Sequence, residues 1–420
     1  MAVAGPLESD SSGIGALRAL ILGLILTLAQ IVFACLAGLY AEGGINANSA
    51  EIVRAYARLA QFDSQWHVWI ADEGYDADKE FQKGVLGNVA FFPAYPLLVR
   101  GVVEITGLPT ALCLLIVAQL ACWGFWTYFF LLLDDHNVSP GNARILALVI
   151  TSQPAAFFLV AGYADSLFLF SLLGYIYWSE SARPAFKWLG AVHGFLMTAT
   201  RIIGLPLVIY PVVRALISGP RSTRMDRLFD AALLAALSSM GGLAFLGYCH
   251  QTFGAWDLTL ITRQAGWHVK PDAMALLNPD NYLLDLVLWK TDGFVSADWL
   301  SRAHVPALLT IFALLFSVEM YVASTLPNST FADRFTYFIV AFVLFGFLVA
   351  GLANSGFRSL IRYILPCEVL LVLQIAHLST DEDLEGSDWA MLGLAGVVIV
   401  PSFVVQAVFA NRFLNGLWVA

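Results

Sequence analysis

Nine apolar runs divide the chain, and each is close to the length that a helix needs to cross a lipid bilayer. A membrane-spanning helix takes about 20 consecutive apolar residues. Hydrophobic residues make up 59% of the 420 residues and charged residues only 13%, whereas soluble domains usually contain about 25% charged residues. We therefore predict an all-α polytopic membrane protein, organised as a single domain over residues 1–420. The runs lie at residues 15–40, 109–133, 143–162, 163–180, 226–249, 303–325, 335–353, 359–377 and 389–410.

A tenth apolar stretch, residues 187–217, is too long for one straight crossing. It is interrupted by Arg201, Pro206 and Pro211. Proline breaks helices in their interior, and a broken helix is tolerated in a membrane where neighbouring helices satisfy the backbone. We predict two short crossings here, which brings the expected total to about eleven transmembrane helices.

The distribution of basic residues predicts an orientation. The short loops with clear basic content lie at residues 181–187 and 214–227, and short basic loops stay in the cytoplasm. This arrangement places two long loops, residues 41–90 and 251–302, on the extracytoplasmic face. It also requires residues 90–107, which contain two prolines, to lie at the interface without crossing.

The net charge and the cysteines exclude several kinds of function. A net charge of −9 gives no support for nucleic-acid binding. All five cysteines fall in or beside apolar runs and lack metal-binding spacing. No phosphate-binding loop, dinucleotide fingerprint, zinc-protease motif or nucleophile elbow occurs in its required context. The sequence leaves metal dependence open: a divalent metal is compatible with it, and no cofactor is specified.

Residues 61–75, in the first outer loop, concentrate acidic and aromatic side chains in an otherwise apolar chain. We expect a short amphipathic helix before Asp63, and His67 lies four residues after Asp63, on the same face of a helix. A carboxylate between Phe62 and Trp66 has the partly desolvated environment of a general base. The alternative is that Asp63 only caps a helix; we favour the catalytic role for Asp63 and a solvated role for Asp72.

Three arginines and a carboxylate, from three distant segments, are expected at the same outer face. Arg201 lies between the two short crossings, and Arg358 and Arg362 lie four residues apart at a helix start, with Asp165 at another. An arginine at the centre of a membrane helix costs roughly 2.5–3.5 kcal/mol, so such residues call for an explanation. Snorkelling to lipid headgroups explains a single arginine. The set predicts a phosphate-binding pocket at the membrane surface.

Two of these stretches resemble a known family. The first outer loop reads F-D-S-x-W-x-x-x-I-A-x-x-G-Y and is followed by A-F-F-P-x-Y-P-L-L-x-R. These motifs resemble the GPI mannosyltransferase 2 (PIG-V-like) family of the GT-C membrane glycosyltransferases. Shorter stretches fit in the same order, at residues 163–168, 199–201, 254–267 and 358–366.

The resemblance implies a glycosyltransferase that uses a polyprenyl- or dolichyl-phosphate-linked sugar, usually mannose, on the extracytoplasmic face. It implies an inverting displacement with Asp63 as the catalytic residue. Two positions depart from the family pattern: Phe62 stands where tryptophan is common, and Asp165 stands where glutamate is common. The second departure puts the role of Asp165 in doubt.

Together, the residues and the resemblance assign three groups of site residues. Asp63 is the expected base, and Arg201, Arg358 and Arg362 are expected to bind the donor phosphate. The sugar or acceptor is expected to be positioned by a further set: Trp66, His67, Tyr163, Asp165, Arg263, Trp267 and His268.

The partners expected besides the donor are the lipid bilayer and an acceptor, which is a glycan, a glycolipid or a protein. The composition and short loops favour a bacterial inner membrane over the endoplasmic reticulum. A transporter or flippase of lipid-linked saccharides is the alternative function, because it also needs many helices and buried arginines. Transporter folds commonly show paired repeats, and none stands out in this sequence.

Overall fold

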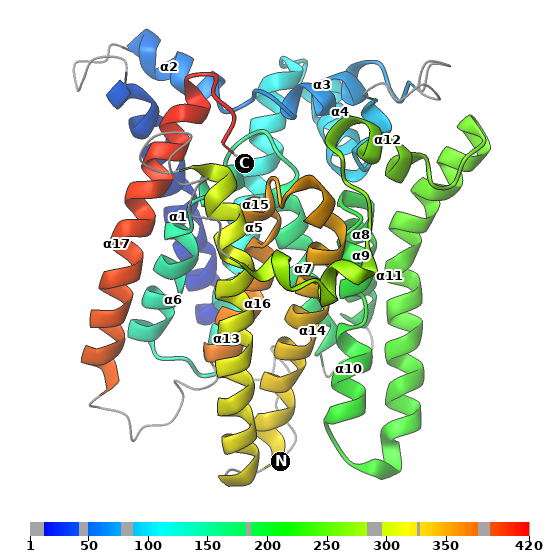
Figure 1. Cartoon of the computed structure of the whole chain (residues 1–420), viewed down its shortest axis with the longest axis vertical. Helices are drawn as coiled ribbons and strands as arrows, with labels where there is room; N and C mark the ends of the chain where they lie inside the picture. The colour runs from blue at the N-terminus through cyan, green and yellow to red at the C-terminus, as the bar shows by residue number, and fades with distance from the viewer. Residues whose placement is uncertain are drawn as a thin grey trace.

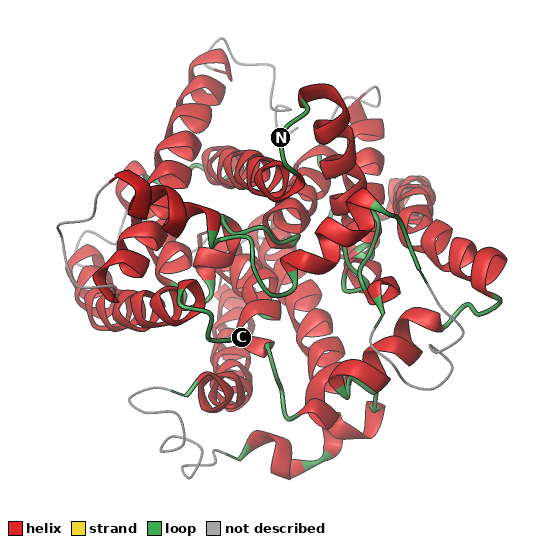
Figure 2. Ribbon diagram, turned by 90° about the horizontal axis from the view of Figure 1, so that it is seen from above, coloured by secondary structure: helices red, strands yellow, loops and turns green. Residues whose placement is uncertain are grey.

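The computed structural model describes residues 12–41, 49–76, 87–181, 186–283, 296–325, 328–376 and 387–419. Within these ranges the chain forms helices and no strands, as predicted. Long helices run roughly side by side along the molecule, and short helices gather at one end (Figure 1). The view from above shows the helices surrounding a central group of shorter segments (Figure 2).

Six helices in the described ranges are long and apolar enough to cross a membrane. The structure is therefore compatible with the predicted polytopic membrane protein, and it does not confirm a count of about eleven crossings. These helices are α1 (Ser12–Ala41), α5 (Thr110–Asp135), α11 (Arg224–Phe253), α13 (Ala297–Thr325), α14 (Asn328–Leu352) and α17 (Ser387–Leu414).

The other apolar runs form shorter helices. Residues 143–180 were expected to cross twice, but α6 and α7 have only 13 and 15 residues. At 1.5 Å per residue they span about 20–22 Å, less than the hydrocarbon thickness of about 30 Å. Pro154 explains the early end of α6, because a proline disfavours helical backbone in the residue before it. The shorter apolar helices are α6 (Pro140–Ser152), α7 (Asp165–Ser179), α8 (Lys187–Thr200), α10 (Tyr210–Ile217) and α16 (Leu365–Ala376).

The predicted break at Arg201 is present. Helix α8 ends at Thr200, Arg201 adopts extended backbone with a φ of −154°, and the chain resumes in the short helices α9 (Gly204–Leu207) and α10. The break frees Arg201 from the helical repeat and turns the chain at this point. It thereby positions a guanidinium group inside the molecule, between α8 and α9.

Glycines allow α8 and α11 to approach closely. A Cβ added at Gly241 would lie 2.0 Å from the carbonyl oxygen of Phe195, and one added at Gly194 would lie 2.1 Å from Oγ of Ser238. Helices in membranes commonly associate through such small residues. The contact holds α8, and hence the break at Arg201, against a long helix.

We expect Gly241→Ala to destabilise the protein, because the added methyl group meets backbone that cannot move aside. Overpacking of this kind costs about 1–3 kcal/mol. Gly247→Ala is the matched control: its Cβ would meet only Trp256, at 3.7 Å, and alanine favours a helix over glycine. Thermal unfolding in detergent should show a lower midpoint for Gly241→Ala alone. Equal midpoints in the two variants would contradict the close contact.

The short helices of the predicted outer loops lie at one end of the molecule (Figure 1). Helix α4 has only 13 residues, in agreement with a segment that does not cross. Residues 42–48, 77–86 and 284–295 of these loops lie outside the described residues. The elements are α2 (Ser49–Ala57), α3 (Ser64–Asp72), η2 (Asn88–Ala90), α4 (Ala94–Thr106) and α12 (Leu258–Trp267), with η6 (Ala273–Leu277), η7 (Pro279–Tyr282) and α15 (Leu360–Tyr363) nearer the bundle.

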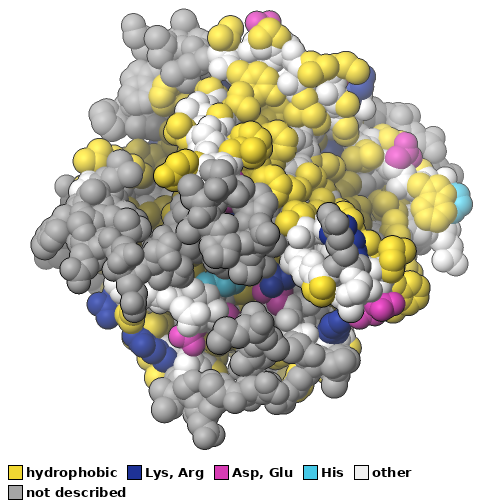
Figure 3. Space-filling view, turned by 90° about the horizontal axis from the view of Figure 1, so that it is seen from below, with side chains coloured by type: hydrophobic (Ala, Val, Ile, Leu, Met, Phe, Trp, Pro, Cys, Tyr) yellow, Lys and Arg dark blue, Asp and Glu magenta, His cyan; other side chains and the backbone are white. Residues whose placement is uncertain are grey.

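The basic turn between α10 and α11 lies at the opposite end (Figure 1). Seen from below, this end carries both basic and acidic side chains beside a broad hydrophobic surface (Figure 3). Lys187 there forms an ion pair of 3.0 Å with Asp230, and Arg214 pairs with Glu180. The two ends of the molecule are thus chemically distinct.

Candidate active site

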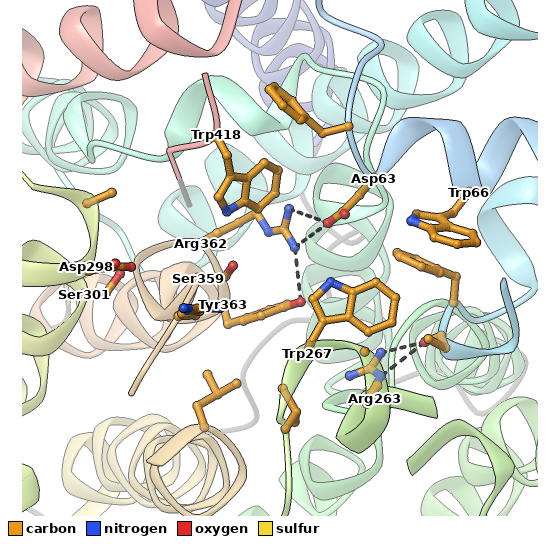
Figure 4. A pocket seen from close by; sticks show the side chains of 18 residues that line it. Asp63, Trp66, Arg263, Trp267, Asp298, Ser301, Ser359, Arg362, Tyr363 and Trp418 are labelled. Carbon is orange, nitrogen blue, oxygen red and sulfur yellow. Dashed lines mark hydrogen bonds and ion pairs between the residues drawn. The ribbon is translucent and has the colours of Figure 1, made fainter. Parts of the chain in front are cut away.

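A cavity of about 590 Å³ lies among the short helices and the nearby ends of the long ones. Segments far apart in sequence build its wall: the start of α3, η2, the end of α12, the start of α13, α15 and the residues after α17. Polar and aromatic side chains point into it together (Figure 4). The charged side chains that line it are Asp63, Arg263, Asp298, Arg358 and Arg362.

Asp63 stands at the position that caps α3, but its side chain makes no capping hydrogen bond. The residue before it, Phe62, has a φ of 57°, a left-handed conformation that residues other than glycine seldom adopt. The Phe62 ring packs on Phe413 and Trp418, with centroids 5.2 and 5.3 Å apart. This packing holds the unusual turn and leaves the Asp63 carboxylate for the cavity.

The Asp63 carboxylate pairs with Arg362, which lies 299 residues later in the chain. Nη1 and Nη2 of Arg362 both lie 3.4 Å from Oδ2 of Asp63, longer than the 2.7–2.9 Å of a strong charged hydrogen bond. Among the described residues Oδ1 has no hydrogen-bond partner. The pair holds the carboxylate in place and leaves one of its oxygens available to a substrate.

Burial raises the pKa of the Asp63 carboxyl above its ordinary value, and the charge of Arg362 offsets only part of this effect. A carboxylate with a raised pKa binds a proton more readily than one in water. Such a group is suited to take a proton from a hydroxyl.

Aromatic rings surround the Arg362 guanidinium. Its Cζ atom lies 5.3 Å from the ring centroid of Phe158, 5.1 Å from that of Tyr163, 5.0 Å from that of Tyr363 and 5.6 Å from that of Trp418. A cation over the face of an aromatic ring is attracted by the ring's quadrupole. This cage explains how an arginine only 4% exposed keeps its charge at the edge of an apolar bundle.

Arg201 does not line the cavity, contrary to the expectation that it contacts a donor phosphate directly. Its Nη1 donates to Oδ1 of Asp165 at 2.5 Å; Asp165 is buried, and the Arg201 side chain is 12% exposed. Its Cζ lies 4.7 Å from the centroid of the Tyr363 ring. Arg201 therefore stands one layer behind the cavity wall, with its charge paired to Asp165.

Arg358 and Arg263 both line the cavity, but they differ in their hydrogen bonds and in their exposure. Arg263 donates from Nε and Nη2 to the carbonyl oxygen of Ala90, at 3.2 and 3.0 Å, which ties α12 to η2. Arg358 is exposed, and none of the described residues pairs with it. Ser359 has a left-handed φ of 61°, so Arg358 precedes α15 rather than lying one helical turn before Arg362.

Three aromatic side chains form one wall of the cavity. Trp66 from α3 stacks on Phe91 at 5.9 Å between centroids, and Trp267 from the end of α12 meets both edge-on, at 6.2 and 5.8 Å. The indoles of Trp66 and Trp267 lie near Arg263 in the close view (Figure 4). Flat apolar surfaces of this kind suit the ring faces of a sugar.

Three further residues that were expected to position a substrate lie outside the cavity wall. His67 is buried edge-on against Phe91 and Tyr95, and burial lowers its pKa to about 3, so the ring is neutral. It therefore does not share the cavity face with Asp63. His268 ends α12 at an exposed position with a φ of 57°. Tyr163 is buried beneath Arg362 and donates to the carbonyl oxygen of Gln61 at 3.0 Å.

Five polar or aromatic residues of the wall escaped the sequence analysis. Tyr363 directly follows Arg362, a residue of the predicted phosphate-binding set. This neighbour is the nearest sequence signal for the role of Tyr363 in the wall. Nothing in the sequence indicates that Trp418, which follows α17, folds back onto Phe62. The five residues are Asp298, Ser301, Ser359, Tyr363 and Trp418.

In the part of the chain that the structure describes, no three His, Cys, Asp or Glu side chains are placed to hold one metal ion. Asp63 and Asp298 are the carboxylates that line the cavity, and Asp63 already pairs with Arg362. The cationic and hydrogen-bonding groups of the wall fit an anion better than a cation.

No protein-family model matches the chain, and no curated protein is similar to it. The resemblance to the GPI mannosyltransferase 2 (PIG-V-like) family therefore stays a prediction from the motifs. An assignment of function depends on the chemistry of the cavity.

Proposed function

We propose that the chain is a membrane glycosyltransferase of the GT-C type, similar to the GPI mannosyltransferase 2 (PIG-V-like) family. It transfers a sugar, expected to be mannose, from a polyprenyl- or dolichyl-phosphate donor to a hydroxyl of a glycan, glycolipid or protein. One observation carries the proposal: the Asp63 carboxylate pairs with Arg362 through one oxygen, none of the described residues bonds to the other oxygen, and Arg358 lines the same cavity. A base next to an anion-binding cluster is the pair of groups that such a transfer needs.

The position of the cavity supports an extracytoplasmic site. The cavity lies at the end formed by α3, α4 and α12, and the basic turn between α10 and α11 lies at the other end (Figure 1). Basic loops stay in the cytoplasm. A lipid-linked donor would then reach the cavity from the outer leaflet.

The proposed reaction is an inverting displacement. Oδ1 of Asp63 accepts the proton of the acceptor hydroxyl, and the hydroxyl oxygen forms a bond to the anomeric carbon. The bond between that carbon and the phosphate oxygen of the donor breaks, and its electron pair stays on the phosphate. Arg362 and Arg358 stabilise the charge that develops there. The lipid phosphate leaves as an anion and needs no proton.

Acid should slow the reaction, because only the ionised form of Asp63 can accept a proton. Burial raises the pKa of this carboxyl, so the midpoint of the fall in rate should lie above the ordinary aspartate value of about 3.9. Measuring kcat/KM from about pH 3 to pH 8 tests this expectation. A midpoint at or below about 3.9 would contradict the base assigned to Asp63.

Trp267→Ala should raise the KM for the donor about tenfold, because removal of an aromatic sugar-stacking surface costs about 1–2 kcal/mol. Trp256→Ala is the matched control, since Trp256 precedes the same helix, is 56% exposed and does not line the cavity. An equal KM in the two variants would argue against a sugar at the aromatic wall.

The proposal is tested with the purified protein and a polyprenyl phosphate that carries radiolabelled mannose. The transferase is expected to move the label to an added acceptor or, more slowly, to water. Intact donor after prolonged incubation with a range of hydroxyl acceptors would count against the proposal.

A further inference from the structure

Three arginines act on the Tyr363 phenol: Arg362 and Arg263 on the cavity wall and Arg201 behind it. Figure 4 shows Tyr363 beside Arg362. Nη2 of Arg362 donates to its hydroxyl oxygen at 3.1 Å. The guanidinium of Arg201 lies over its ring at 4.7 Å, and Arg263 acts on the phenol from α12. The hydroxyl group is therefore held in a strongly positive region.

The hydrogen-bonding capacity of this hydroxyl is only partly used. A phenol can donate one hydrogen bond and accept others. Arg362 occupies an acceptor position, and none of the described residues accepts the phenolic hydrogen. Because Tyr363 lines the cavity, this hydrogen is available to whatever occupies the space.

The surrounding charges favour an anion as that occupant. Burial alone would raise the pKa of Tyr363, but Arg362, Arg201 and Arg263 outweigh it and lower the pKa. A more acidic phenol is a stronger hydrogen-bond donor. The exposed guanidinium of Arg358 lines the same cavity and offers the anion a second contact.

We propose that Tyr363 donates a hydrogen bond to a phosphate oxygen of the lipid-phosphate leaving group, with Arg362 fixing its hydroxyl and Arg201 supporting its ring from behind. The proton stays on the phenol throughout. Arg201 then acts as a positioning residue through Tyr363. The identity of the anion rests on the proposed function, whereas the binding of a phosphate monoester at Tyr363 can be tested without any sugar.

The test uses farnesyl monophosphate, a prenyl phosphate without a sugar, and calorimetry on the purified full-length protein in detergent. Tyr363→Phe removes only the hydroxyl and should weaken binding about fivefold to tenfold at pH 7.5. Tyr282→Phe, whose hydroxyl donates to the Leu276 carbonyl oxygen at 2.8 Å away from the cavity, should bind as the wild type does. Farnesol should not distinguish wild type from Tyr363→Phe.

The pH dependence separates hydrogen bonding from a structural role. The arginines lower the pKa of Tyr363, so wild-type affinity should fall towards that of Tyr363→Phe at a pH below about 10, the ordinary value for a phenol, because an ionised phenol can no longer donate. The groups that face Tyr363 are Arg362, Arg201, Arg263 and Asp63. Arginine side chains keep their protons throughout this pH range, so they do not produce an alkaline step of their own. Tyr363→Phe should lack the alkaline step.

Equal affinity of Tyr363→Phe and wild type, or the same alkaline step in both, would overturn the inference. A loss of farnesyl phosphate affinity in Tyr363→Phe, in a protein that transfers no sugar, would support the inference and count against the proposed function. Sugar transfer that is insensitive to Tyr363→Phe would support the proposed function and count against the inference about Tyr363.

Discussion

Asp63→Asn should lower the rate of sugar transfer by about 10²–10⁴-fold or more, because asparagine cannot accept a proton from the acceptor hydroxyl. The amide has nearly the shape of the carboxyl group, so the cavity should keep its form. Donor binding should change much less than turnover. Single-turnover transfer and equilibrium donor binding, measured on the same preparation, separate these two effects.

Asp72→Asn is the matched control for this change. Asp72 is an exposed carboxylate at the end of the same helix, where it accepts a hydrogen bond from Thr110 at 2.5 Å outside the cavity. This variant should turn over at the wild-type rate. Turnover of Asp63→Asn at the wild-type rate would remove Asp63 from the reaction.

Arg362→Lys should produce the second large loss, about 10²-fold or more in kcat. Lysine keeps the positive charge but lacks the flat, forked guanidinium. Arg362 uses that shape to contact Asp63 and Tyr363 at once, inside a cage of four aromatic rings. Without the guanidinium, the Asp63 base loses its fixed position. The phosphate also loses a hydrogen-bond donor that stabilises the negative charge developing on it.

The control for this substitution is Arg54→Lys on α2, where the arginine side chain is 62% exposed and pairs only loosely with Glu51, at 3.9 Å. It should leave transfer unchanged. Thermal midpoints of both variants should be compared with that of the wild type, so that loss of the fold is recognised. A folded Arg362→Lys protein with wild-type kcat would contradict the role assigned to the guanidinium.

The helical class and most long helices follow from apolar length alone. Helices α5 and α11 match their predicted runs closely, because an uninterrupted apolar run leaves few alternatives in a membrane. The number of crossings could not be predicted from apolar length. Pro154 ends α6 early, and Pro366 stands at the start of α16. In both places an apolar run long enough to cross a membrane forms a helix that is too short to do so.

The site was only partly predictable, for geometric reasons. Orientation from basic loops brought Asp63 and Arg362 to one end, where they pair. Helical spacing failed for Arg358, since Ser359 takes a left-handed conformation, and for His67, whose ring turns into the aromatic packing around Tyr95. Trp418 enters through a chain reversal after α17, and such a contact has no signature in sequence.

The central claim is that the lipid-phosphate sugar is cleaved in this cavity. It is tested most directly with a donor labelled by tritium in mannose and by phosphorus-32 in the phosphate, added to proteoliposomes. We predict that the labels separate: tritium appears in the acceptor or in water, phosphorus-32 stays with the prenyl lipid, and Asp63→Asn prevents the separation. Labels that stay together while the donor crosses the bilayer would contradict the claim and identify a transporter of lipid-linked saccharides.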